Sequence, residues 1–252
     1  MTLPVWGDPQ SLNAALPWFI MAGRNDARQK GFDVAAAACR EYLARGGHAQ
    51  SIFCPLITKE HLEQLDYLRT LANEHPQHVI VFAGFCPNLA AFRQGADLGL
   101  MPSLYEPFGM ANEYYLDGVP VVARATGGIT QQVIPFLAGA AYSDAVRQRT
   151  TPSSTPTGIL YREPDNISTD AAQWRCLNNA NNDPARWHDS ALYHAMTKEL
   201  TLALLDAEHL TTMPHLYADL AIAGALHIQR RFSWYKNKAA YDRLIDSDLR
   251  AA

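Results

Sequence analysis

The sequence predicts an α/β protein with a doubly wound, mostly parallel sheet and a helical C-terminal part. Short apolar runs support this prediction, because nearly continuous hydrophobic segments of strand length are typical of strands covered on both faces. The runs lie at residues 18–22, 51–54, 79–83, 98–101 and 119–123. Helical patterns alternate with them at residues 32–45, 58–74, 88–94 and 108–116. This regular alternation favours a parallel sheet with helices on both faces.

The remainder of the chain is mainly helical. The helical pattern runs from residue 186 to residue 249, without an internal repeat or a low-complexity tract. Polar loops at residues 150–157 and 178–184 need not mark domain boundaries. We therefore expect an N-terminal linker at residues 1–17 and a single domain at residues 18–252.

Composition narrows the classes of function. The net charge of -4 and the pI near 6.1 provide no basic footprint for nucleic acid. The chain has no apolar run of membrane-spanning length, and its start lacks the basic and apolar regions of a signal peptide. Its four cysteines are scattered, as expected for reduced thiols. We expect a cytoplasmic protein with neither a nucleic-acid nor a membrane partner.

A pair of carboxylates in residues 102–113 indicates a functional site. Glu106 precedes Pro107, which suits the first position of a helix, and Glu113 follows on that helix. The free amides and positive dipole end of such a helix suit an anion. Because like charges repel, Glu106 is better suited to sugar hydroxyls than to phosphate, and Glu113 to the vicinal hydroxyls of a ribose. The alternative for Glu113 is an exposed helix charge.

A second signal is a pair of cations that follows the first apolar run. Gly23 opens a loop in which Arg24 and Lys30 lie before the next predicted helix. A planar guanidinium and a mobile ammonium together suit a diphosphate, whose charge they can neutralise. A solvated basic loop is the alternative interpretation. The sequence contains neither a Walker loop nor a Gly-x-Gly-x-x-Gly turn, and its histidines have no metal-binding spacing.

Two other loops carry weaker signals. Phe85 follows the run at residues 79–83, where an aromatic ring could stack on a nucleobase, although packing in the core is equally compatible with the pattern. Thr126 and Gly127 follow the run at residues 119–123. A glycine there allows the backbone to approach a ligand closely, and a plain tight turn is the competing interpretation.

Several of these segments, taken in order, resemble one family. The matching motifs lie at residues 23–33, 95–103, 106–113, 118–122, 126–129, 157–161 and 231–234. They resemble the nucleotide-sugar-binding half of retaining glycosyltransferases with the two-domain GT-B fold, particularly bacterial glycogen and starch synthases. The resemblance covers most of residues 18–165 and 229–246, and it implies a Rossmann-like sheet.

The resemblance also implies a reaction: metal-independent transfer of a hexose, with retention, from ADP-glucose or UDP-glucose to an α-glucan, without a cofactor. It implies that Arg24 and Lys30 hold the leaving diphosphate and that Glu106 contacts the donor sugar. It implies that Gly23 belongs to the phosphate-binding loop, and that the backbone at Phe108, Gly109 and Met110 helps to bind the sugar and the phosphate. Glu113 would bind the ribose and Phe85 would flank the base. Thr126 and Gly127 complete the implied binding residues.

One departure from the family leaves two interpretations open. Family members carry a preceding domain with a Lys-x-Gly-Gly loop, and no such motif precedes residue 18. The chain is then either the donor-binding half of an enzyme, completed by an N-terminal GT-B domain in cis or in trans, or a binding module that captures a nucleotide or nucleotide sugar without catalysis. A nucleotide-sugar epimerase fits poorly, since the dinucleotide glycine turn is missing.

Overall fold

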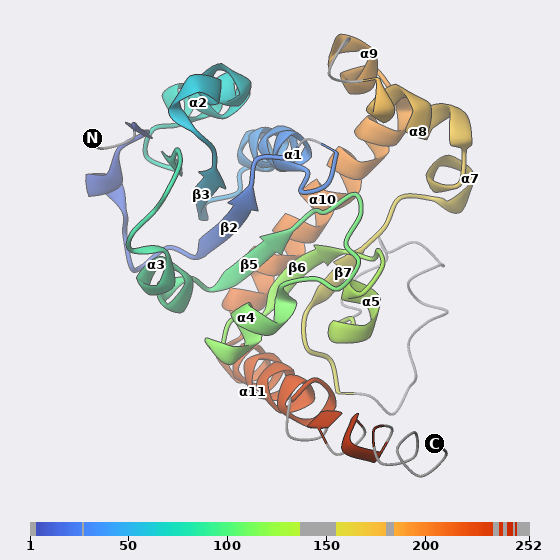
Figure 1. Ribbon diagram of the computed structural model, residues 1–252. Helices are drawn as coiled ribbons and strands as arrows, with labels where there is room; N and C mark the ends of the chain where they lie inside the picture. The colour runs from blue at the N-terminus through green and yellow to red at the C-terminus, as the bar shows by residue number, and fades with distance from the viewer. Residues whose placement is uncertain are drawn as a thin grey trace.

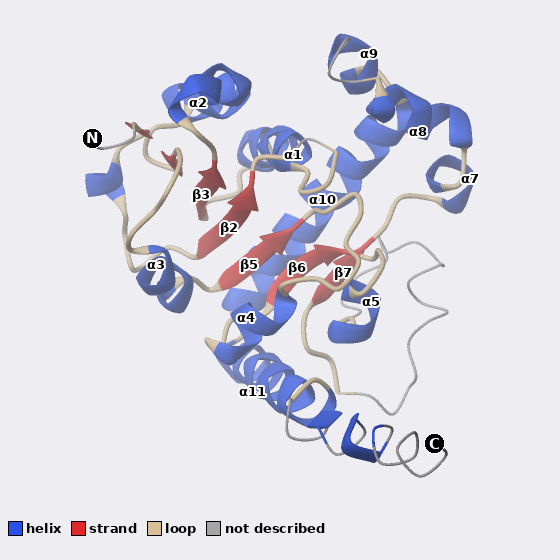
Figure 2. Cartoon of the chain, viewed as in Figure 1, coloured by secondary structure: helices blue, strands red, loops and turns tan. Residues whose placement is uncertain are grey.

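Seven strands form one sheet at the centre of the computed structural model, in the order β1-β4-β3-β2-β5-β6-β7 (Figure 2). The structure describes residues 4–26, 28–136, 155–179, 184–233, 237–238, 241–243 and 245. The strands are β1 (Val5–Trp6), β2 (Trp18–Arg24), β3 (Gln50–Leu56), β4 (Val79–Phe82), β5 (Leu98–Met101), β6 (Val121–Arg124) and β7 (Ile159–Tyr161). All neighbouring strands pair in parallel except β1, which is antiparallel to β4. The predicted mostly parallel sheet is confirmed.

The N-terminal segment contributes to this sheet. Val5 pairs with Phe82 and Trp6 with Val81, so that β1 forms one edge. The sequence predicted only a linker at residues 1–17, because a strand of two residues has no alternating pattern long enough to detect.

Strand order reverses between β2 and β5. From β2 the sheet continues through β3 to β4 on one side, and through β5 to β6 and β7 on the other. Such a reversal opens a crevice beyond the carboxyl ends of the two central strands, where open α/β sheets bind their ligands. The two loops that leave β2 and β5 there are the ones that carry Lys30 and Glu106.

Helices cover both faces of the sheet, as the prediction of a doubly wound fold requires (Figure 1). Helices α1 (Phe32–Ala44), α2 (Asp66–Glu74) and α10 (Ala191–Thr211) lie over one face, and α3 (Leu89–Gly95), α4 (Ala111–Leu116) and α11 (Pro214–Arg231) over the other. Two buried apolar clusters correspond to these faces, one around Val34 and Leu200 and one around Tyr115 and Ile228.

Shorter elements complete the described chain. They are η1 (Pro9–Ser11), η2 (Lys59–Leu65), α5 (Ile129–Gln132), α7 (Asp165–Ser168), α8 (Ala171–Asn178) and α9 (Pro184–His188). The predicted helix at residues 58–74 is therefore a 3-10 segment followed by α2. The predicted C-terminal helices are present as α10 and α11. Residues 150–154 and 180–183 of the two polar loops, and Trp234 of the last matching motif, lie outside the described residues.

The predicted start of the helix that carries Glu113 is wrong. Helix α4 begins at Ala111, after Met110 at its N-cap, so Pro107 does not occupy the first helical position. Gly109 adopts a left-handed φ of 93°, which stops a helix from extending back through it. Gln132 Nε2 donates to the carbonyls of Phe108 at 2.7 Å and Gly109 at 3.2 Å, which holds the preceding segment as a loop.

Replacement of Gly224 by alanine should destabilise the protein, although alanine is the better helix former by about 1 kcal/mol. A Cβ at this position of α11 would lie 2.3 Å from Cδ1 of Tyr115, a fully buried ring on α4. Overpacking of this kind costs about 1–3 kcal/mol and outweighs propensity. Urea denaturation of Gly224→Ala measures the balance, and a net gain in stability would contradict the close approach of the two helices.

Candidate functional site

A pocket of about 510 Å³ opens at the carboxyl ends of the central strands. Most of the residues that the sequence singled out line it: Gly23, Arg24, Lys30, Phe85, Glu106, Phe108, Gly109 and Met110. They come from the last two residues of β2 and from the loops that follow β2, β4 and β5, and they meet because these strands are parallel. A smaller pocket of about 100 Å³ adjoins the first through Gly23, Lys30 and Met110, and contains Glu113 in its lining.

Lys30 and Glu106 are in direct contact within the larger pocket. The Lys30 Nζ atom lies 2.6 Å from Glu106 Oε2, and the two side chains are only 13% and 7% exposed. Ser103 Oγ donates to the same oxygen at 3.2 Å. From the sequence, we predicted that Lys30 binds phosphate and that Glu106 contacts sugar hydroxyls. The structure brings these two side chains into direct contact within one pocket.

The loop that carries the predicted cations is held by its own hydrogen bonds. The Lys30 amide donates to the carbonyl of Asp26 at 2.8 Å, and Arg24 Nη2 donates to Gln29 Oε1 at 2.9 Å. Gly31 adopts a φ of 71°, and a Cβ there would lie 2.6 Å from the Pro102 carbonyl oxygen. The glycine therefore allows this loop to pack directly against the loop that follows β5.

The loop at residues 102–110, called the site loop below, is clamped from both sides. On one side, the Leu104 amide donates to the Gln29 carbonyl at 2.8 Å. On the other, the Gly128 amide donates to the Glu106 carbonyl at 2.9 Å. These bonds set the backbone on which the Glu106 carboxylate is carried.

Thr126 and Gly127 serve this clamp. The hydroxyl of Thr126 lies 3.4 Å from the Leu104 carbonyl, and a Cβ at Gly127 would lie 2.0 Å from the Glu106 carbonyl oxygen. Close approach at this glycine was predicted, but the group that approaches is the site loop. Neither residue is part of the lining described for the two adjoining pockets.

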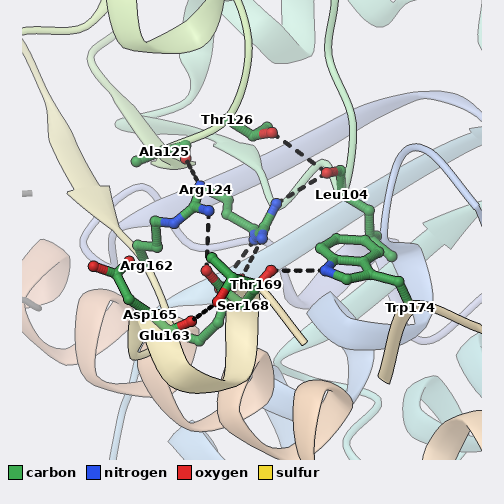
Figure 3. A network of polar contacts seen from close by, with 10 residues as sticks. All are labelled: Leu104, Arg124, Ala125, Thr126, Arg162, Glu163, Asp165, Ser168, Thr169 and Trp174. Carbon is green, nitrogen blue, oxygen red and sulfur yellow. Dashed lines mark hydrogen bonds and ion pairs between the residues drawn. The ribbon is translucent and has the colours of Figure 1, made fainter. Parts of the chain in front are cut away.

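A buried ion pair supports the site loop from behind (Figure 3). Arg124, at the end of β6, bonds both oxygens of Glu163, which follows β7, and donates from Nη1 to the Leu104 carbonyl at 2.9 Å. The exposed fractions are 1% for the Arg124 side chain and 0% for Glu163. The Arg124 guanidinium also lies 5.4 Å from the centre of the Trp174 ring, close enough for a cation–π contact. No motif in the sequence connects residues so far apart, and reasoning from sequence missed this pair.

Glu113 lies beside the main pocket and has a cationic partner that the sequence did not reveal. Its carboxylate is 47% exposed, and Arg93 Nη1 lies 2.7 Å from its Oε2 atom. The Nε atom of the same guanidinium bonds Asp117. Burial lowers the pKa of Arg93, but the bond to Asp117 and the nearby charges outweigh it and raise the pKa overall. Glu113 is thus an exposed carboxylate on a helix, as the alternative interpretation had it, but one with an arginine partner and a place in the lining of the smaller pocket.

Exposed apolar side chains surround the mouth of the larger pocket. Phe85 is 76% exposed, and Phe108 and Met110 are 58% and 42% exposed. Packing of Phe85 in the core is therefore excluded, and its ring faces solvent at the pocket edge. Cys54 and Cys86 also line the pocket, and burial and the neighbouring Cys86 thiol raise the pKa of Cys54.

Comparison with protein families assigns the chain to a class. The family model described as glycosyl transferases group 1 matches residues 17–147, which is just over half of the chain and includes both site-forming loops. The chain therefore belongs to the group 1 glycosyl transferases. Its sheet and helices form one Rossmann-like half of a GT-B fold.

The curated relatives that the chain resembles include bacterial glycogen synthases. The chain is 30% identical over 172 residues to a glycogen synthase of Paracidovorax citrulli, a match that covers 67% of the chain and 30% of that protein. It is also 30% identical over 185 residues to a glycogen synthase of Cellvibrio japonicus, covering 70% of the chain and 34% of that protein. The chain thus spans about a third of the length of these relatives.

Solved structures share the fold at lower sequence identity. Sucrose-phosphate synthase from Thermosynechococcus elongatus aligns with a TM-score of 0.62 at 20% identity, over 98% of this chain and 50% of its own. The C-terminal domain of a group 1 glycosyl transferase from Francisella tularensis aligns with a TM-score of 0.52 at 13% identity, over 87% and 89% of the two chains.

The described residues offer neither a metal-binding cluster nor a membrane-spanning helix. They contain no group of three or more His, Cys, Asp and Glu side chains arranged to hold a metal ion. No helix among them is both long and apolar enough to span a membrane.

Removal of one partner from the Arg124–Glu163 pair should cost about 3–5 kcal/mol, because the other charge remains buried and unpaired. We expect this loss for Arg124→Met and for Glu163→Leu. The double variant Arg124→Met/Glu163→Leu should recover most of it, with about 1–2 kcal/mol still missing because the Leu104 carbonyl then keeps only the more distant Thr126 hydroxyl as a donor. Urea denaturation of all three measures the coupling, and losses that simply add would show that the pair does not act as a unit.

Proposed function

We propose that this chain is the donor-binding domain of a retaining glycosyltransferase that transfers a hexose, glucose in the first instance, from a nucleoside diphosphate sugar to a glucan. The contact between Lys30 and Glu106 inside the pocket at the sheet crevice carries this proposal. It brings a cation suited to phosphate and a carboxylate suited to sugar hydroxyls to the point where the two parts of such a donor are joined.

The chemistry requires stabilisation of negative charge. Transfer breaks the bond between the anomeric carbon of the sugar and an oxygen of the diphosphate, which keeps the bonding electrons. The same carbon forms a bond to a hydroxyl oxygen of the acceptor, and the hydroxyl proton passes to the diphosphate. Lys30 and Arg24 line the same pocket and supply positive charge to the departing diphosphate. No metal ion is needed for this step in the proposed mechanism, since the two side chains provide that charge.

Other lining residues suit the remaining parts of the donor. The exposed ring of Phe85 provides an apolar surface for the base. Glu113 in the adjoining pocket can accept hydrogen bonds from ribose hydroxyls. The site loop backbone at Phe108, Gly109 and Met110 lies beside both Glu106 and the cations, where it can seat the sugar and the phosphate.

An acceptor-binding domain is a further part of the proposal. The chain spans 30% of the Paracidovorax citrulli glycogen synthase, and the apolar rim around the pocket is open to solvent. We infer that an N-terminal GT-B domain, in cis or in trans, completes the cleft. The second candidate is a domain that binds a nucleotide sugar without catalysing transfer, a role for which the pocket alone suffices.

Calorimetry with ADP, UDP and their glucose conjugates tests the proposal. We expect micromolar to millimolar affinity for at least one of them, and Arg24→Ala should weaken it by about tenfold through loss of a charge-assisted bond to phosphate. Arg28→Ala is a suitable control, because Arg28 belongs to the same loop but to neither described pocket lining. If no ligand binds, the donor-site assignment fails. Glucose transfer that appears only when an acceptor domain is supplied would favour the enzyme over the binding module.

Substitution of Glu106 by glutamine should change the affinity for the phosphate part of the donor and the affinity for its sugar part by different factors. It removes a negative charge 2.6 Å from Lys30 Nζ, so ADP should bind about tenfold more tightly. The glucose conjugate should gain less, because an amide accepts hydroxyl hydrogen bonds less strongly than a carboxylate. The ratio of the two dissociation constants from calorimetry gives the answer. Glu74→Gln removes an exposed carboxylate that is paired with Arg40 and serves as the control. An equal change in affinity for both ligands would show that Glu106 does not contact the sugar.

A further inference from the structure

We propose that Arg93 is a positioning residue, which orients Glu113 to receive the ribose hydroxyls of the bound nucleotide. The inference rests on the proposed function. Arg93 belongs to α3, a helix that carries none of the residues predicted for the site, yet it lines the small pocket together with Lys30 and Glu113.

The guanidinium holds two carboxylates at once, Glu113 on α4 and Asp117 at the C-cap of that helix. Its Nη1 atom lies 2.7 Å from Glu113 Oε2, and its Nε atom bonds Asp117 Oδ2. The other Asp117 oxygen, Oδ1, accepts from Gln94 Nε2 at 3.4 Å. A planar fork that satisfies two partners in different directions has its orientation set by both, which a lysine ammonium cannot reproduce.

Burial assigns different roles to the two carboxylates. The Asp117 side chain is 13% exposed and the Arg93 side chain is 21% exposed, whereas Glu113 is 47% exposed. Asp117 is therefore the anchor on the inner side, and Glu113 is the carboxylate presented to the pocket. An exposed pair such as Arg40–Glu74, with both side chains 45% exposed, has no comparable anchor.

Arg93 also determines which oxygen of Glu113 is available. Oε2 accepts from Arg93, and Oε1 takes no hydrogen bond from the part of the chain that the structure describes. An unrestrained glutamate on a helix surface occupies several rotamers, and ordering it opposes binding. With Arg93 in place, that ordering precedes the ligand, and Oε1 is free to accept from a vicinal hydroxyl.

The same geometry separates Arg93 from the phosphate-binding cations. Its charge is compensated by two carboxylates, Glu113 and Asp117, whereas Lys30 has the single partner Glu106 among its described contacts. Loss of Arg93 should therefore weaken recognition of ribose and leave recognition of phosphate unchanged. This selectivity separates positioning from a general structural role.

The test compares Arg93→Met with the unmodified chain by calorimetry. The ligands are whichever of ADP and UDP binds more tightly, its 2′,3′-dideoxy analogue, and inorganic pyrophosphate. In the unmodified chain, the dideoxy analogue should bind about tenfold more weakly than the ribonucleotide, since a hydrogen bond to a charged group is lost. In Arg93→Met this ratio should fall below about threefold, with the affinities for the dideoxy analogue and pyrophosphate unchanged.

Further variants keep the test decisive. Asp117→Asn should reduce the same ratio by a smaller factor, because it weakens the anchor, and Arg93→Lys should restore only part of the discrimination. Arg40→Met is the matched control and should leave the ratio as it is. Thermal melting of each variant confirms that it is folded, and Asp117→Asn carries the test if Arg93→Met is not.

The outcomes distinguish this inference from the proposed function. Suppose that the unmodified chain prefers the ribonucleotide to its dideoxy analogue, and that Arg93→Met and Asp117→Asn keep the same preference. That result would leave the proposed function standing and overturn the positioning role of Arg93. Equal weakening of all three ligands would also overturn it, in favour of a structural role. If the unmodified chain binds the ribonucleotide and its dideoxy analogue with equal affinity, ribose recognition by Glu113 is wrong, and so is the role of Arg93. If no nucleotide binds, the proposed function itself is overturned.

Discussion

The buried pair of Arg124 and Glu163 joins the two strands at one side of the sheet crevice to the loop that forms the site. Each charge depends on the other, because neither side chain has access to water. The remaining donor of Arg124 is directed to the Leu104 carbonyl, two residues before Glu106. The backbone that carries Glu106 is thus supported by two side chains that are not part of the lining described for the two adjoining pockets.

Around this pair, the crevice is formed by backbone contacts between loops. Gly31 and Gly127 let neighbouring loops approach the site loop more closely than any side chain would permit. Tight contact of this kind restrains the site loop on both sides, and Lys30 reaches Glu106 across it. A rigid frame of this type suits a reaction that depends on fixed charges, since those charges need not reorganise as the transition state forms.

Much of the architecture could be predicted from sequence. Strands β2 to β6 follow apolar runs, and helix α1 begins one residue after Gly31, as its pattern predicts. The site loop was found because its residues form a compact motif, but the start of α4 was misplaced. Pro107 is a good first helical residue by propensity, whereas the bonds from Gln132 to the site loop carbonyls favour a loop. A tertiary contact outweighed a local preference.

The sequence by itself determined the positions of strands β2 to β6 and which loops carry charge, because apolar periodicity and residue type are local properties of the chain. Only the tertiary structure decided the strand order, and with it the crevice between β2 and β5. It also decided the partners of the charges: Lys30 with Glu106, Arg93 with Glu113, and Arg124 with Glu163. These partners are 76, 20 and 39 residues apart, and no local pattern encodes contacts over such separations, which follow from packing of the whole sheet.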